Sequence, residues 1–123
     1  MGFSPRLWIG KVIQYPKEDK KCVRIRNWTF FNAYDVCFTI EYRTNGNKLN
    51  SFISTGTLIP SIERGESFFL ELKSEANNDK VKEFFVNQNE KSIIVITAVF
   101  QSKIGIKKRK TRTIQLNKER MYP

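Results

Sequence analysis

The sequence predicts an all-β chain, folded as an antiparallel β-sandwich or small barrel of about seven strands. Three observations support this prediction. Apolar and polar residues alternate with a period of two in several segments, turn-forming residues separate those segments, and a single short stretch, 79–86, has helical spacing. The chain has 123 residues, of which 40% are hydrophobic, so we expect one domain over 1–123.

The first three strands are predicted from alternation. Residues 6–14 combine β-branched residues with basic interruptions, which is typical of an outer strand. Residues 21–26 place Val23 and Ile25 on an inward face. Residues 35–43 give the clearest pattern, because their apolar residues share one parity: Val36, Phe38, Ile40 and Tyr42.

Turn signals organise the rest of the chain. Asn45-Gly46 predicts a tight hairpin that leads into a strand at 48–54, since both residues tolerate a positive φ. Residues 58–62 are expected to form an extended connection, because Pro60 cannot donate to a strand ladder. Asp79 can cap the short helix at 79–86. The remaining strands are predicted at 67–73, at 92–100, whose apolar residues on both parities indicate a central strand, and at 107–116.

Positive charge is concentrated at both ends of the chain. The net charge is +5 over 1–26, −2 over 27–102 and +7 over the basic C-terminal strand and tail, 103–123. The run 107–112 suits an anionic partner, either a phosphodiester backbone or acidic lipid head groups, and it also suits a solvated edge strand. If the first and last strands lie side by side, the two ends form one surface. The candidate contacts to an anionic surface are Lys103, Lys107, Lys108, Arg109, Lys110 and Arg112, with Lys11, Arg24 and Arg26 from the other end.

The composition argues against catalysis. The chain has no histidine and two cysteines, so catalytic triads and the usual zinc sites cannot be assembled, and we expect no catalytic residue, no metal and no cofactor. Cys22 and Cys37 are predicted on outward faces of different sheets, as thiols rather than a disulfide. This favours the cytoplasm or the cytoplasmic face of a membrane. The enzymatic alternative is a site that uses carboxylates, or a reactive Cys22 near Lys20, Lys21 and Arg24.

Four aromatic residues, Trp28, Phe30, Phe31 and Tyr34, cluster between the second and third predicted strands. They can pack into the end of the core or form a contact surface. Their neighbours are amides and an acid rather than arginines, which does not match a surface that stacks nucleic-acid bases.

The stretches 27–36 and 58–67 resemble bacterial and archaeal modules of the CARDB type. The matching positions are Asn27, Ala33, Val36, Ile62, Gly65, Glu66 and Ser67. Arg64 stands where that family usually has proline, and the basic run 107–112 replaces its acidic ending. The resemblance implies an immunoglobulin-like sandwich without enzymatic activity. Related sandwiches occur as extramembrane parts of transporters and channels.

We therefore expect a non-catalytic, immunoglobulin-like binding or structural module, as in the extramembrane domain of a membrane-associated protein. Its partners would be another protein, or a second copy bound at exposed strand edges, and an acidic membrane surface. The alternative is a nucleic-acid-binding β-domain that uses the basic run 107–112.

Overall fold

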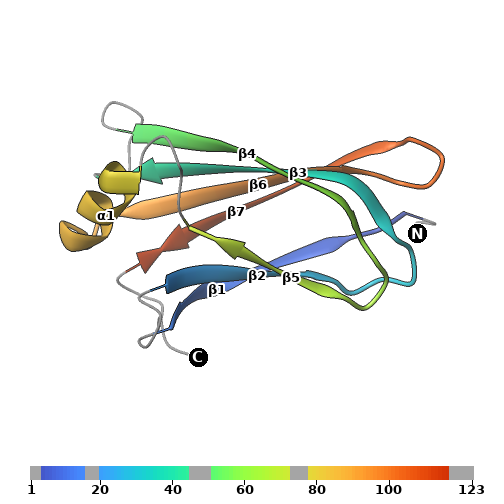
Figure 1. The fold of residues 1–123 in the computed structure, drawn as a ribbon, viewed down its shortest axis with the longest axis horizontal. Coiled ribbons are helices and arrows are strands. Elements are labelled where there is room, and N and C mark those ends of the chain that lie inside the picture. The colour runs from blue at the N-terminus through green and yellow to red at the C-terminus, as the bar shows by residue number, and fades with distance from the viewer. Residues whose placement is uncertain (1–3, 16–19, 45–50, 73–77, 117–123) are drawn as a thin grey trace.

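The computed structural model describes residues 4–15, 20–44, 51–72 and 78–116, which form two packed antiparallel sheets and one helix (Figure 1). The three-stranded sheet has the order β1 (Leu7–Tyr15), β2 (Lys20–Asn27), β5 (Ser67–Glu71). The four-stranded sheet has the order β4 (Ser51–Ile62), β3 (Ala33–Arg43), β6 (Ile93–Gln101), β7 (Lys107–Gln115). The helix, α1 (Asn78–Val86), lies at one end. The predicted all-β sandwich is confirmed.

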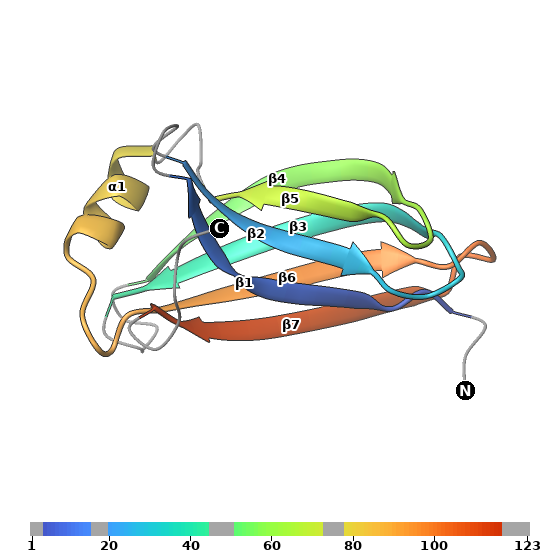
Figure 2. The same ribbon diagram turned by 90° about the horizontal axis from the view of Figure 1, so that it is seen from below.

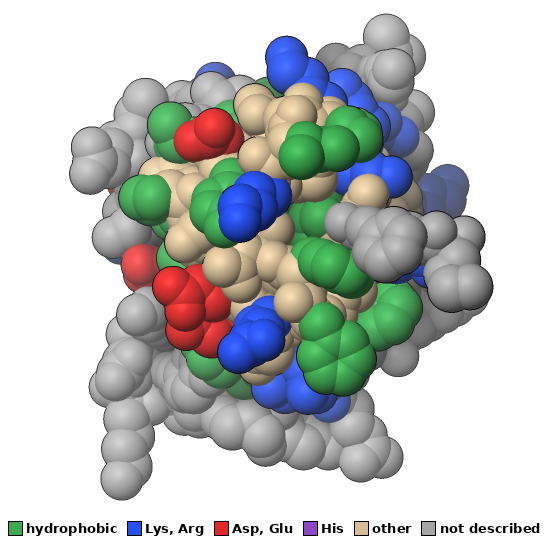
Figure 3. All heavy atoms as spheres, turned by 90° about the vertical axis from the view of Figure 1, so that its right-hand side faces the viewer, with side chains coloured by type: hydrophobic (Ala, Val, Ile, Leu, Met, Phe, Trp, Pro, Cys, Tyr) green, Lys and Arg blue, Asp and Glu red, His purple; other side chains and the backbone are tan. Residues whose placement is uncertain are grey.

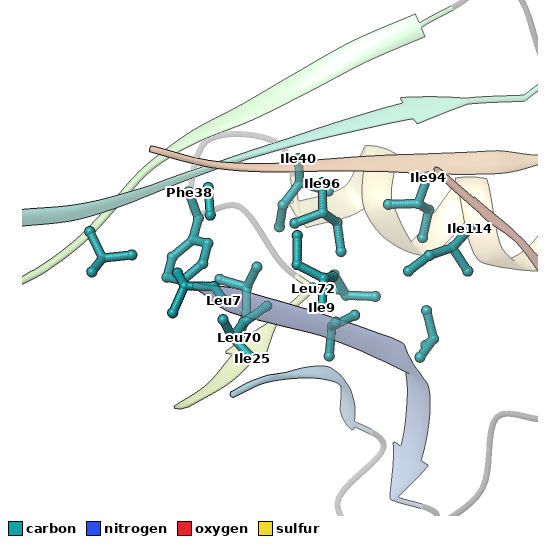
Figure 4. Close-up of a cluster of buried hydrophobic side chains, with 14 of the residues drawn as sticks. Leu7, Ile9, Ile25, Phe38, Ile40, Leu70, Leu72, Ile94, Ile96 and Ile114 are labelled. Carbon is teal, nitrogen blue, oxygen red and sulfur yellow. The ribbon is translucent and has the colours of Figure 1, made fainter. Parts of the chain in front are cut away.

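The two sheets bury their inner faces against each other (Figure 4). On β3 the predicted parity is confirmed, since all four apolar residues assigned to the inward face are buried. The helix prediction is also confirmed, and α1 closes one end of the core with Val81 and Phe84. The Phe84 ring packs edge-to-face on Tyr42, with centroids 5.2 Å apart.

The prediction of a connection at 58–62 is wrong, because β4 runs unbroken through this segment to Ile62. Pro60 lies between Ile59, which pairs with Val36, and Ser61, which pairs with Tyr34. A strand at the edge of a sheet has backbone groups that face away from the ladder, so a residue without an N–H is tolerated there. The predicted Asn45-Gly46 turn, the start of the 48–54 strand and residues 117–123 of the basic tail lie outside the described residues.

The strand predicted at 92–100 lies inside its sheet, between β3 and β7, as expected. Full cover on both faces is not found, because Ile93, Val95 and Val99 are only half-buried on the outer face. The second layer of the sandwich covers the inner face alone.

The first and last strands lie side by side along one edge of the sandwich, as the sequence analysis proposed (Figure 2). A hydrogen bond joins them directly, since Arg112 Nη1 donates to the backbone oxygen of Ile9 at 3.1 Å. The end opposite α1 is built from residues 28–32 between β2 and β3, 63–66 between β4 and β5, and 102–106 between β6 and β7 (Figure 1). We call it the loop end.

Candidate contact surface at the loop end

One buried asparagine organises the loop end. The Asn27 side chain is fully buried, and its Nδ2 donates to the backbone oxygens of Phe31, at 2.6 Å, and Ile62, at 3.0 Å. Its Oδ1 accepts bonds from the backbone N–H and the hydroxyl of Thr29. Its backbone bonds Gly65 and Glu66 in the turn between β4 and β5. The loop 28–32 is therefore held in one conformation against two neighbouring segments.

The held loop exposes its aromatic side chains. Trp28 is 55% exposed and Phe30 is 85% exposed, while Phe31 is also exposed and Tyr34 is half-buried on β3. Of the two readings left open by the sequence, the structure supports a surface rather than core packing for Trp28, Phe30 and Phe31. Asn27 accounts for the exposure of these rings, because its polar side chain occupies the end of the core that an aromatic ring would otherwise fill.

The hairpin between β6 and β7 adds two aliphatic side chains to the same end. Ile104 is 82% exposed and Ile106 is 49% exposed. Gly105 sits between them with a φ of 86°, a left-handed conformation that favours glycine and allows the tight turn. Figure 3 looks onto the loop end and shows hydrophobic side chains interspersed with lysines and arginines, with acidic side chains towards the left of the view. Exposed apolar clusters with a polar rim are typical of interaction surfaces.

Cations border this apolar group. Lys103, Lys107, Lys108, Arg109 and Lys110 are all exposed on the hairpin and the adjoining part of β7. Arg112 differs from them, because it is half-buried and bonded to Ile9. From the start of the chain, the Arg6 guanidinium lies over the Trp28 ring, 6.0 Å from its centroid.

Two of the β7 lysines share the face of the sheet that carries core residues. Lys108 pairs with Phe100 and Lys110 pairs with Ala98, and both partners are buried. Residues directly opposite in an antiparallel pair point to the same side of the sheet. These ammonium groups nevertheless remain exposed, because β7 is an edge strand.

The three cations predicted from the N-terminal part lie elsewhere. Lys11 is exposed on β1, while Arg24 and Arg26 alternate along β2 with buried Val23 and Ile25. The arginines therefore point outward from the three-stranded sheet. Of the nine predicted cations, six therefore lie on the hairpin and β7, two lie on this outer face, and Lys11 lies at the register irregularity of β1.

Two adjoining shallow hollows, of about 440 and 390 Å³, open at the loop end and share Tyr34 and Lys103. Acidic and basic groups are mixed in them, since Glu63 and Arg64 line the first and Asp35 lines the second. Within the described ranges, no group of three or more His, Cys, Asp or Glu residues is placed to hold a metal ion. The geometry supports surface contact more than enclosed binding.

Cys22 alternates with buried Val23 and lies outside the core cluster, as parity predicts, but its side chain is only 2% exposed. It lies on the middle strand of its sheet, between Ile13 on β1 and Glu71 on β5. Cys37 lies on β3 in the other sheet, and both residues are thiols. Reactive cysteines are typically partly exposed, so the burial of Cys22 does not favour the reactive-cysteine alternative.

Sequence reasoning missed one surface group. Trp8 on β1 and Phe69 on β5 are about equally exposed, at 47% and 49%, on the same outer face as Arg24 and Arg26. Parity alone could have assigned each to an outward face. Their proximity depends on the pairing of three strands.

No model of a known protein family matches this chain, and no curated protein matches it. Among the described residues, no helix has the length and apolar character needed to cross a bilayer.

Proposed function

We propose that the protein is a non-catalytic, immunoglobulin-like binding module that contacts an acidic membrane surface through its loop end, as the extramembrane domain of a membrane-associated protein. The resemblance to CARDB-type modules supports the fold family and the absence of catalysis. The exposed residues of the loop end support the membrane contact.

The observation that carries the proposal is the combination of side chains at one end of the sandwich. Five exposed apolar side chains lie there beside exposed cations: Trp28, Phe30, Phe31, Ile104 and Ile106. Tryptophan prefers the bilayer interface, and the transfer of aliphatic groups out of water is favourable. Each lysine or arginine near an acidic leaflet adds about 1 kcal/mol.

The hairpin tip favours a membrane over nucleic acid for this surface. Ile104 and Ile106 project aliphatic groups between Lys103 and Lys107, and such groups neither pair with phosphates nor stack on bases. Arg112, the last cation of the basic run, is engaged by β1. The basic run therefore offers nucleic acid only phosphate contacts, without an element that recognises the bases.

The test is binding to phosphatidylserine-containing vesicles, measured by co-sedimentation and by the emission of Trp28 in a Trp8→Phe background. We expect salt-sensitive binding with a blue shift. The double variant Ile104→Ser and Ile106→Ser should weaken binding about tenfold or more, since two buried aliphatic side chains contribute several kcal/mol when inserted. Val86→Ser is the control, because Val86 is aliphatic and, at 81%, about as exposed as Ile104, but lies on α1 at the opposite end.

Three results would contradict this function. They are no vesicle binding at low salt, equal binding to neutral phosphatidylcholine vesicles, and equal binding by the Ile104/Ile106 double variant and wild type. Oligonucleotide binding that depends on Lys107 and Lys108, without vesicle binding, would instead support the nucleic-acid alternative. A protein partner or self-association at strand edges stays a prediction, which sedimentation velocity can examine.

A further inference from the structure

We propose that the outer face of the three-stranded sheet is a second binding surface, and that it takes single-stranded nucleic acid. The four residues that define it are Trp8, Arg24, Arg26 and Phe69, which we call the ring–arginine face. This inference does not rest on the proposed membrane contact, because none of the four lies on the loop end or its hairpin.

Strand pairing brings these residues together. Trp8 pairs with Arg26 across β1 and β2, and Phe69 pairs with Arg24 across β5 and β2. Their sequence neighbours Ile9, Ile25 and Leu70 are buried in the core, so the four side chains occupy the opposite face. Rings on the two outer strands therefore flank guanidinium groups on the middle strand.

The Trp8 ring lies along the sheet. A Cβ atom added to Gly10 would come within 2.9 Å of Trp8 Cη2 and 3.0 Å of Cζ3, so the indole covers the space that this glycine leaves open. With 47% exposure, the ring is half covered by the strand beneath it and half open to solvent. A flat ring in a fixed position suits stacking by a planar partner, and it is poorly placed to insert into a bilayer.

The arginines supply charge for a phosphate backbone. Arg24 Nε donates to Ser67 Oγ at 2.9 Å, which directs its guanidinium towards Ser67, the β5 residue opposite Arg26. A guanidinium has five N–H donors, so one bond to serine leaves capacity for a phosphate. The carboxylate described on this face, Glu71, lies farther along, opposite Cys22, away from Trp8 and Arg26.

The spacing fits a strand of nucleotides. With strands about 4.8 Å apart and residues about 3.3 Å apart along a strand, the backbones of Trp8 and Phe69 are separated by roughly 12 Å. Two unpaired bases can stack on rings this far apart while their phosphates pass the middle strand. Aromatic side chains on an open sheet face bind bases in this way without strong sequence preference. A duplex does not fit, because its bases are already stacked.

The decisive experiment uses Trp8 as a reporter. The chain has two tryptophans, so Trp28→Phe leaves Trp8 alone. We expect oligothymidylate of about 12 nucleotides to quench Trp8 emission, and Trp8→Ala, followed by anisotropy of a labelled oligonucleotide, to weaken binding at least about fivefold. Arg24→Gln with Arg26→Gln should reduce the salt dependence of log K by about 1.4, since each lost phosphate contact on a single strand contributes about 0.7.

Controls separate this face from general charge effects. Lys80→Gln with Lys82→Gln removes two exposed charges from α1 and should leave the quenching of Trp8 unchanged. Circular dichroism checks the fold of each variant. Trp8→Phe should bind the oligonucleotide more tightly than Trp8→Ala does, because it keeps an aromatic ring.

Several outcomes overturn the inference. They are no quenching by the oligonucleotide, equal affinity for duplex DNA, and binding that is lost with Lys107→Gln and Lys108→Gln but kept without Arg24 and Arg26. A shift of Trp8 emission with vesicles but not with oligonucleotide would assign this face to the membrane. Trp28 emission reports vesicle binding, and Trp8 emission reports binding of the oligonucleotide. The membrane proposal and the nucleic-acid proposal can therefore fail independently.

Discussion

Replacing Asn27 with alanine tests whether one side chain holds the loop end together. The change removes four hydrogen bonds. Loss of the buried bond to Ile62 leaves a carbonyl without its donor, at a cost of about 1–3 kcal/mol. The other three bonds are partly exposed, so water replaces part of each, at about 0.5 kcal/mol apiece. We expect a loss of about 3 kcal/mol.

Thermal unfolding converts this figure into a measurable shift. An unfolding entropy of about 2.1 cal/mol/K per residue gives roughly 0.26 kcal/mol/K for this chain, so Tm should fall by about 12 °C. Asn32→Ala is the control, because Asn32 belongs to the same loop and its side chain makes two bonds that are not fully buried: Oδ1 accepts from the backbone N–H of Arg64, and Nδ2 donates to the Tyr34 hydroxyl. Equal shifts for the two variants would refute the reasoning. Vesicle binding should also weaken in Asn27→Ala, although Trp28 and Phe30 are retained.

Three further changes test other parts of the fold. Gly10→Ala should displace the Trp8 ring, seen as greater iodide quenching in the Trp28→Phe background, and an unchanged Trp8 would contradict the close contact. Phe84→Ala should cost about 3–5 kcal/mol in denaturant unfolding, whereas Val86→Ala should stay within about 0.5 kcal/mol; similar losses would mean that α1 is not anchored by its buried face. Burial raises the pKa of Tyr42, so its contribution to stability is present below the unfolded value of about 10 and declines as pH rises above it. Tyr42→Phe should flatten that alkaline decline, and an identical pH profile would exclude this linkage.

The strands could be predicted because one face of each sheet is buried. On β3 a period of two is the physical consequence of a core on one side and water on the other. The same reasoning failed at Pro60, because the rule against proline applies to inner strands and the sequence does not say which strand is an edge. On β1 a register irregularity between Ile9 and Val12 lets both residues be buried, although they differ in parity.

The candidate surfaces were harder to predict from the sequence, because they depend on which strands pair. The basic run and the aromatic loop were recognisable as candidates, but their meeting at one end follows from strand order. Parity assigns Cys22 to an outward face, but its burial could not be predicted without knowing that β2 is the middle strand of its sheet. Trp8 and Phe69 are 61 positions apart in the chain, and only the pairing of β2 with both β1 and β5 places them near the same arginines.

The lysines on β7 bear on whether another sheet can add to this edge strand. An open strand edge invites another sheet to extend it, and Lys108 and Lys110 would then have to lose water against a second apolar layer. Burying two ammonium groups without partners costs far more than a few ladder bonds return. Fibre growth along this edge is thereby discouraged while the same cations stay available to an acidic surface.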